Sequence, residues 1–185
     1  MATNSAIGIQ ISWANNVIGN GTAAGANLIS GMNGFLYGIY ITGSGATGNT
    51  LKGNIIGLQK DGSTCVTGST QWNGVNITLS AASNSIGGNG AGEGNVISGN
   101  NTYGIFLNSS AATGNTILGN IIGPQANGMS YVSSNPQTYG VYISGSPNNT
   151  IGGNTAGARN ILSANETYGV YISGASSTGN VVKGN

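Results

Sequence analysis

One six-residue phrase, Asn-x-apolar-x-Gly-Asn, occurs six times along the 185-residue chain, and this repetition constrains the fold more than any other feature. The copies occupy residues 15–20, 49–54, 84–89, 115–120, 149–154 and 180–185. Self-similarity at a regular period is the signature of a repeat protein, in which each unit covers the hydrophobic face of its neighbours. The chain is therefore expected to form a stack of similar units.

Two more phrases accompany the first. Gly-apolar-x-apolar starts at Gly8, Gly38, Gly74, Gly104, Gly140 and Gly169. Asn-apolar-apolar-Ser/Gly starts at Asn27, Asn54, Asn95, Asn120 and Asn160. Each phrase is short, rich in β-branched residues and bounded by Gly, Asn or Ser, a pattern that predicts brief strands joined by tight turns.

The spacing of the Gly phrases predicts how these strands pair. Successive copies are 30, 36, 30, 36 and 29 residues apart, so two unequal turns make a super-repeat of about 65 residues. Three short strands that recur in one order cannot pair as hairpins, and equivalent strands are expected to stack in parallel. The predicted fold class is an all-β, single-stranded parallel β-helix (β-solenoid) of about six turns with three short strands per turn. It forms a single domain over residues 1–185, without a separate cap and with turns starting near residues 8, 38, 74, 104, 140 and 169.

Alternation along the strands assigns three aliphatic rows to the core. The Gly phrases supply Ile9, Ile39, Val75, Ile105, Val141 and Val170, and also Ile11, Ile41, Ile77, Leu107, Ile143 and Ile172. The Asn-x-apolar-x-Gly-Asn phrases supply Val17, Leu51, Ile86, Ile117, Ile151 and Val182. The extra length of the longer turns falls in loops 58–72 and 124–138, which act either as spacers or as carriers of binding residues.

The amino-acid sequence of the last units resembles that of a known family. Asn-Thr-Ile-Gly-Gly-Asn at 149–154, Ala-Gly-Ala-Arg-Asn at 156–160 and Tyr-Gly-Val-Tyr-Ile at 168–172 are similar to repeats of the pectate-lyase-like superfamily. In particular, they resemble the Asn/Gly-rich arrays of secreted and surface proteins of bacteria. The resemblance covers almost the whole chain and implies a right-handed parallel β-helix. Because that fold hosts lyases, hydrolases, adhesins and structural parts, the resemblance does not choose a function.

Charge is sparse in this chain. The net charge is +1, there is no His, and the charged residues are Lys52, Lys60, Asp61, Glu93, Arg159, Glu166 and Lys183. Proteins bind nucleic acids and anionic membranes through clustered Lys and Arg. A membrane-spanning helix needs about 18 or more apolar residues. We therefore expect no nucleic-acid partner and no membrane insertion.

Candidate catalytic residues and metal ligands are also few. Asp61, Glu93 and Glu166 fall at different corners of different turns, whereas glycoside hydrolysis usually needs two carboxyl groups that face one bond. The Gly-rich segment 87–92 lacks the Asp of a calcium-binding β-roll, and Ca²⁺ prefers several carboxylate or carbonyl oxygens. The sequence predicts no enzyme, no cofactor and no metal. A polysaccharide lyase or hydrolase, which the resemblance would allow, is the least favoured function.

Aromatic side chains form the candidate binding face. Alternation turns the third residue of each Gly phrase outward, and these outward residues include Tyr40, Phe106, Tyr142 and Tyr171. Further Tyr residues stand immediately before the Gly residues. Three roles are open: mutual stabilisation of neighbouring strands, an interface with another subunit, and the binding of sugar rings.

Asn recurs where the second strand of each turn begins, at Asn49, Asn84, Asn115, Asn149 and Asn180. Asn tolerates left-handed backbone, and identical Asn side chains at the strand spacing can bond to one another up a column. The sequence therefore predicts a structural Asn ladder that satisfies polar groups buried in the turns.

The two ends of the chain suggest its partners. Asn185 is in register with Asn120, 65 residues earlier, and neither end carries a distinctive capping repeat. Exposed end strands invite pairing, so the expected partners are copies of the chain stacked head to tail or adjoining repeats of a longer chain. The expected function is a non-enzymatic structural module of an extracellular, cell-surface protein or filament. The alternative is a carbohydrate-binding or adhesin module that binds glycans with its Tyr-lined face.

Overall fold

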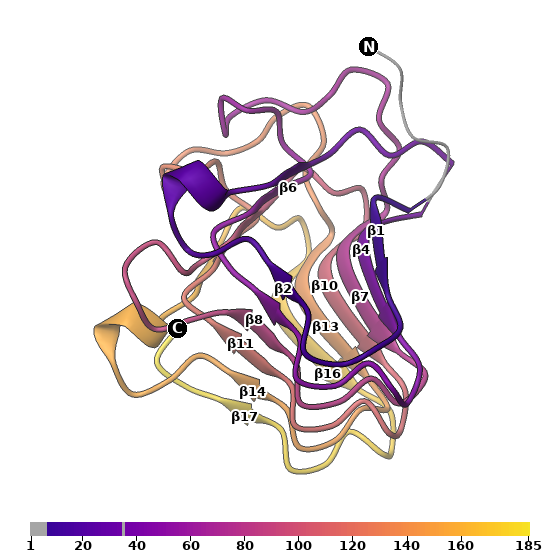
Figure 1. Cartoon of the computed structure of the whole chain (residues 1–185). Coiled ribbons are helices and arrows are strands. Elements are labelled where there is room, and N and C mark those ends of the chain that lie inside the picture. The colour runs from indigo at the N-terminus through magenta and orange to yellow at the C-terminus, as the bar shows by residue number, and fades with distance from the viewer. Residues whose placement is uncertain (1–6, 35) are drawn as a thin grey trace.

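The computed structural model describes residues 7–34 and 36–185 and is almost entirely β. Helix in this part of the chain is confined to two 3₁₀ turns, η1 (Ala23–Gly25) and η2 (Ala156–Ala158). The strands stack in three parallel sheets, an arrangement compatible with a β-solenoid (Figure 1). The all-β class with stacked parallel strands, expected from the repeat spacing, is confirmed.

Each of the three repeated phrases builds one sheet. The first sheet contains, in order, β1 (Ile9–Ile11), β4 (Tyr37–Thr42), β7 (Asn73–Thr78), β10 (Tyr103–Asn108), β13 (Tyr139–Ser144) and β16 (Tyr168–Ser173). The second contains β2 (Val17–Ile18), β5 (Thr50–Leu51), β8 (Ser85–Gly87), β11 (Thr116–Leu118), β14 (Thr150–Ile151) and β17 (Val181–Val182). The third contains β3 (Leu28–Ile29), β6 (Ile55–Ile56), β9 (Val96–Ile97), β12 (Ile121–Ile122) and β15 (Ile161–Leu162). We call strands that follow one another through the sheets, such as β4, β5 and β6, a layer, and number the layers from the N-terminus.

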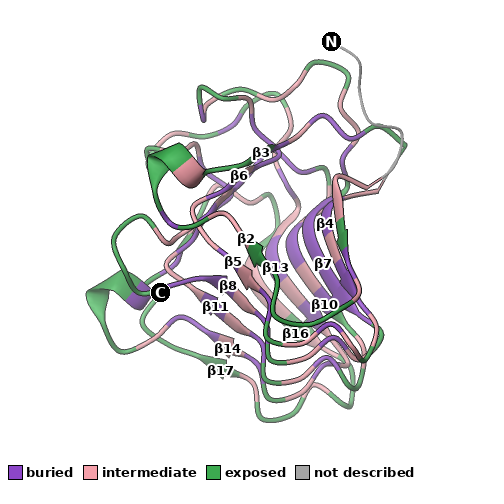
Figure 2. Ribbon diagram, viewed as in Figure 1, coloured by how far each residue is buried: buried purple, intermediate pink, exposed green. Residues whose placement is uncertain are grey.

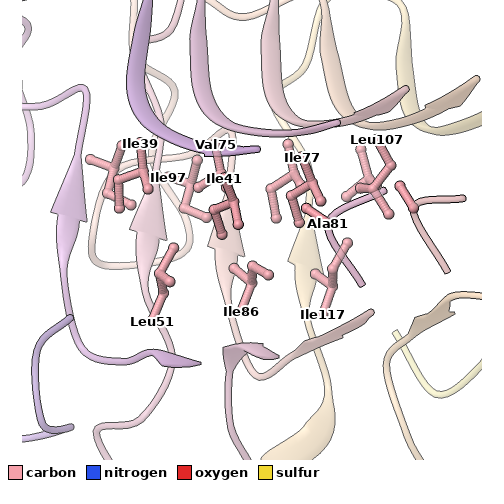
Figure 3. Packing of buried hydrophobic residues seen from close by; sticks show 14 of the residues in the cluster. Ile39, Ile41, Leu51, Val75, Ile77, Ala81, Ile86, Ile97, Leu107 and Ile117 are labelled. Atoms are coloured by element: carbon pink, nitrogen blue, oxygen red, sulfur yellow. The ribbon is translucent and has the colours of Figure 1, made fainter. Parts of the chain in front are cut away.

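The core lies between the three sheets. In the first sheet Ile39 pairs with Val75 and Ile41 with Ile77, as the predicted rows require. These side chains are fully buried, and the inner layers of the ribbon carry the buried residues (Figure 2). Figure 3 shows side chains of neighbouring layers packed in rows across the core. Burying one such aliphatic side chain stabilises the folded state by roughly 1.5–3 kcal/mol, so each layer is stabilised mainly by the layers on either side.

The prediction of the core rows is wrong at one residue. Val17 pairs with Thr50 and is exposed, while Ile18 pairs with Leu51 and packs against the core. The inward residue of β2 is therefore Ile18, one position later than the repeat phrase suggested.

The cause of this shift is the doublet Asn15-Asn16. Asn15 has a φ of 61° and occupies the left-handed turn position that Gly48, with a φ of 64°, fills in the next layer. Asn is one of the few side chains that enter this region readily. Asn16, and not Asn15, consequently stands in register with Asn49.

The two long loops contain the same tight turn. The carboxylate of Asp61 accepts hydrogen bonds from the N–H of Ser63 at 2.9 Å and from the N–H and hydroxyl of Thr64 at 3.1 and 2.8 Å. These bonds hold the pKa of the Asp61 carboxyl well below its usual range. In the second loop the side chain of Asn127 accepts hydrogen bonds from the corresponding two N–H groups. Asp61 and Asn127 are structural equivalents.

The last layer leaves part of the core uncovered. In the last layer Ile172 is 36% exposed and Val182 is 47% exposed, whereas their partners Ile143 and Ile151 are fully buried. In the first layer the inward residues Ile11 and Ile29 are only 5% and 6% exposed, and the exposed Leu28 lies on the outer side of its strand. Within the described part of the chain, no further layer covers either end.

Candidate functional site

The predicted aromatic residues lie together on the outside of the first sheet. They form two neighbouring columns, Tyr37, Tyr103, Tyr139 and Tyr168 beside Tyr40, Phe106, Tyr142 and Tyr171. We call this surface the aromatic face. It brings together all four of the outward aromatics singled out in the sequence.

The rings of the aromatic face stack on one another along the columns. Phe106 and Tyr142 have centroids 5.0 Å apart and planes inclined by 17°, and Tyr142 and Tyr171 are 5.0 Å apart and inclined by 27°. Stacked pairs of this kind add about 0.5–1.5 kcal/mol beyond their buried area. Because the ring faces cover each other, mainly ring edges and hydroxyl groups are left for a ligand. The outermost rings, Tyr168 and Tyr171, have no ring stacked beyond them among the described residues.

Two Asn residues interrupt the aromatic columns at β7. Asn73 and Asn76 pair in register with Tyr103 and Phe106 on one side, and both Asn side chains are 3% exposed. Their Oδ1 atoms are buried without a hydrogen-bond partner. A buried acceptor without a donor typically costs about 1–3 kcal/mol, so β7 is a locally destabilised point in the sheet.

The tyrosine hydroxyls respond to two different environments. Burial raises the pKa of Tyr103, and the neighbouring Tyr142 and Tyr139 hydroxyls raise it further. Hydrogen bonds lower the pKa of Tyr142, whose hydroxyl lies 3.0 Å from Oγ of Ser173. The aromatic face therefore contains two phenol groups whose pKa values are shifted in opposite directions, upward for Tyr103 and downward for Tyr142.

The predicted Asn residues are stacked in one hydrogen-bonded column, which we call ladder 1. Its members, in order, are Asn16, Asn49, Asn84, Asn115, Asn149 and Asn180. Each side-chain amide donates to Oδ1 of the next member, at 2.9 Å from Asn49 to Asn84 and at 3.1 Å from Asn115 to Asn149. The backbone N–H of each member donates to the same oxygen. One Oδ1 atom thus accepts hydrogen bonds from both the backbone N–H and the side-chain amide of the Asn in the preceding layer.

A second Asn column, ladder 2, runs beside the third sheet. Its members are Asn27, Asn54, Asn95, Asn120, Asn160 and Asn185, which precede the third-sheet strands or close the last phrase. The donor again points to the next layer, as in the 2.9 Å bond from Asn54 to Asn95. The two ladders run in the same direction.

A third column mixes Asn with Gln and was not recognised in the sequence. Gln71 donates to Asn100 at 2.8 Å, Asn100 to Gln137 at 3.2 Å and Gln137 to Asn165 at 2.9 Å. In the first layer the equivalent place beside Gly8 is taken by Met32, which cannot donate. Oε1 of Gln71 is accordingly buried without a partner.

The direction of the ladders makes the two ends of the molecule chemically different. Oδ1 of Asn16 and Oδ1 of Asn27 accept no hydrogen bond within the described chain, so the first layer presents acceptors. At the other end Asn180 uses its side-chain amide for the carbonyl of Ser146, and its backbone N–H has no acceptor within the described residues. The last layer presents donors.

The carboxylates are dispersed over the structure. Glu93 is held by Lys52 at 2.8 Å, which lowers the pKa of the Glu93 carboxyl. Asp61 accepts from its own turn, and Glu166 follows the third sheet in another layer. Over residues 7–34 and 36–185 no three His, Cys, Asp or Glu side chains gather as metal ligands would. In the same ranges there is no helix with the length and apolar character to cross a membrane.

Comparison of the chain with protein-family models, with curated proteins and with solved structures returned no match. The resemblance to pectate-lyase-like repeats remains a prediction from the sequence. What the geometry of the described residues defines is a stack of parallel strands with an exposed last layer, three amide ladders and one aromatic face.

Proposed function

We propose that the chain is a non-catalytic structural module whose two end layers bind a further layer of the same kind, and that a second copy of the chain supplies it. We also infer that the strands form a right-handed β-helix of about six turns, since five successive layers repeat the same three phrases and the last layer repeats the first two. Stacked in this way, the copies would build a filament. An extracellular, cell-surface setting belongs to the same proposal and is supported by the sparse charge of the chain.

The observation that carries this proposal is the complementarity of the end layers. The first layer presents the free Oδ1 atoms of Asn16 and Asn27, and the last layer presents free donors of Asn180. Joined head to tail, ladders 1 and 2 would continue across the junction, because Asn180 would meet Asn16 and Asn185 would meet Asn27. Joined head to head, acceptors would meet acceptors. A heterologous contact that does not close produces a fibre.

The exposed core of the last layer supports the same joint. Val182 and Ile172 point inward like their fully buried partners Ile151 and Ile143. Covering such side chains removes apolar surface from water, which stabilises an assembly by about 25 cal/mol per Å². Tyr171 also has a ring face open at this end, against which another side chain can stack.

Light scattering and electron microscopy across protein concentration test the proposal. We expect polymers that lengthen with concentration, and we expect Val182→Lys to abolish them because an ammonium group would be placed in the joint. Val181→Lys is the matched control, because Val181 lies on the same strand but pairs with the outward Thr150. Particles that stay monomeric at every concentration, or equal loss of assembly in both variants, would reject self-stacking.

Carbohydrate binding is the second candidate, and one observation favours it. Tyr168 and Tyr171 have an open ring face on which a sugar ring can lie. A glycan array with Tyr171→Ala tests this idea. Phe106→Ala is the control, because the Phe106 ring stacks on Tyr103 and Tyr142. Binding that is lost only in Tyr171→Ala supports the candidate, and the absence of binding to any glycan removes it.

A further inference from the structure

The third sheet carries an aliphatic stripe on its outer surface. Each of its strands contains two adjacent apolar residues, and in a strand successive side chains point to opposite faces. The second residue of each pair faces the core, as Ile56 and Ile97 do. The first residues are left outside, and they are Leu28, Ile55, Val96, Ile121 and Ile161. A stacked core does not require these five outer side chains to be apolar.

The two parts of this stripe differ in what lies over them. The loop after β12 lies against the C-terminal part, where Gly128 approaches the Cδ1 atoms of Ile161 and Ile121, and Ile161 is 38% exposed. The N-terminal part forms the floor of a groove of about 500 Å³, in which Leu28, Ile55 and Val96 lie in successive layers. This volume falls in the usual range of small-molecule sites, about 300–1,000 Å³.

The walls of the groove are made of small residues and one cation. The lining includes Thr22, Ala23 and Ala26 around η1, together with Gly53, Gly92 and Gly94. It also includes Lys60, which is the one charged residue in the lining. Small wall residues leave the floor accessible, so the groove combines an aliphatic base with a single positive group.

The ammonium group of Lys60 is free to bind a ligand. The nearby Lys52 is engaged by Glu93 at 2.8 Å, whereas Lys60 makes no ion pair within residues 7–34 and 36–185. The adjacent Asp61 carboxylate accepts three hydrogen bonds from Ser63 and Thr64 in its own turn. The charge that lines the groove is therefore uncompensated by a direct partner.

We propose that this groove binds an unbranched aliphatic chain that ends in a carboxylate. The hydrocarbon lies along Leu28, Ile55 and Val96, and the carboxylate pairs with Lys60. Three layers at about 4.8 Å spacing span about 10 Å, which suits a medium-length chain such as decanoate. The floor and walls of this site come from one chain, and its Asn27 and Leu28 also belong to the first layer, onto which the stacking proposed above would add a further copy.

Isothermal titration calorimetry with decanoate, below the concentration at which it forms micelles, tests the site. We expect Lys60→Met to weaken binding about two- to fivefold, the range of a partly exposed ion pair. Ile55→Thr should weaken it further by removing apolar contact. Decan-1-ol should bind to the native chain more weakly than decanoate does. The Lys60→Met variant should bind decan-1-ol and decanoate with equal affinity. Lys183→Met, a charge removal in the last layer, should leave the affinity for decanoate unchanged.

Hydrogen–deuterium exchange locates the ligand in either assembly state. Decanoate should protect residues 22–29, 53–60 and 92–97, and it should leave the last layer unchanged. The proposal is overturned if decanoate produces no heat and no protection, or if protection falls on the last layer instead. Equal affinity of the native chain and Lys60→Met for decanoate would also overturn it.

Discussion

The side-chain amide of Asn115 donates a hydrogen bond to Oδ1 of Asn149 across 3.1 Å, and both side chains are fully buried. Oδ1 of Asn115 in turn accepts two donors of Asn84. Asn115→Leu keeps a similar volume but leaves these donors unpaired in the core. Orphaned buried polar groups cost about 1–3 kcal/mol each, so we expect the free energy of unfolding to fall by about 3 kcal/mol. Urea denaturation followed by circular dichroism measures the loss.

The end of the same ladder supplies the control for this prediction. Asn180 is partly exposed, its amide donates to the carbonyl of Ser146, and its Oδ1 accepts two part-buried hydrogen bonds from Asn149. Water can replace its contacts, and Asn180→Leu is expected to cost about 1 kcal/mol or less. Equal destabilisation at Asn115 and Asn180 would contradict a stabilising role that depends on burial of the hydrogen bonds.

The mixed ladder predicts a coupling between Met32 and Gln71. The substitution Met32→Gln would bring a side-chain donor to the layer where Oε1 of Gln71 lacks one. We therefore expect Met32→Gln to be more favourable, by about 1 kcal/mol, in the native background than in a Gln71→Leu background. Unfolding free energies of the two single variants and the double variant give this coupling. A coupling near zero would show that the two positions do not interact.

Stability at alkaline pH should depend on the tyrosines of the aromatic face. Burial raises the pKa of Tyr103 above its ordinary value of 10.0. The unfolded chain then loses this proton first as the pH rises, so the stability that neutral Tyr103 contributes is present below pH 10 and is lost above it. Tyr103→Phe should make the fall in melting temperature between about pH 9 and 11 less steep.

Tyr142 should show the opposite behaviour. Its hydrogen bonds to Ser173 and Ser144 lower its pKa, so the folded state favours the ionised phenol. Its contribution grows as the pH rises, and Tyr142→Phe should make the alkaline fall steeper. Melting temperatures of the two variants over the same pH series decide the matter, and slopes that change in the same direction would contradict the assigned environments.

The two equivalent loops allow a reciprocal exchange. The lowered pKa of Asp61 contributes stability that is present above the pKa of the unfolded chain and lost below about pH 4. Asn127 makes the same turn without a charge. Asp61→Asn should therefore lower the stability at pH 7 and make it less sensitive to acid, whereas Asn127→Asp should add acid sensitivity. Melting temperatures from pH 7 downward test both variants, and acid profiles identical to the native one would refute the equivalence.

The stacking of parallel strands could be predicted from the sequence because the three phrases recur in one order at regular spacing. The rows containing Ile39 and Val75 follow directly from alternation. The prediction failed at Val17, because the doublet Asn15-Asn16 offers two frames and only the positive φ of Asn15 chooses between them. Sequence alone carries the identity of a turn residue, but not the conformation that the neighbouring layer imposes.

Two parts of the candidate sites were harder to recognise. The mixed ladder alternates Gln71 and Gln137 with Asn100 and Asn165, so no single residue type recurs. The groove beside Lys60 joins residues from three separated segments, and its floor depends on which layers a loop covers. The adjacent apolar pairs of the third phrase were a usable signal, since one member of each pair must face outward.

The common direction of the amide ladders has a kinetic consequence for any polymer built on this joint. One tip of the polymer would offer acceptors such as Oδ1 of Asn16, and the other would offer donors of Asn180. An arriving copy must strip water from carbonyl oxygens at one tip and from N–H groups at the other. The two tips would therefore elongate at different rates, and a copy that arrived inverted would halt growth at the tip it reached.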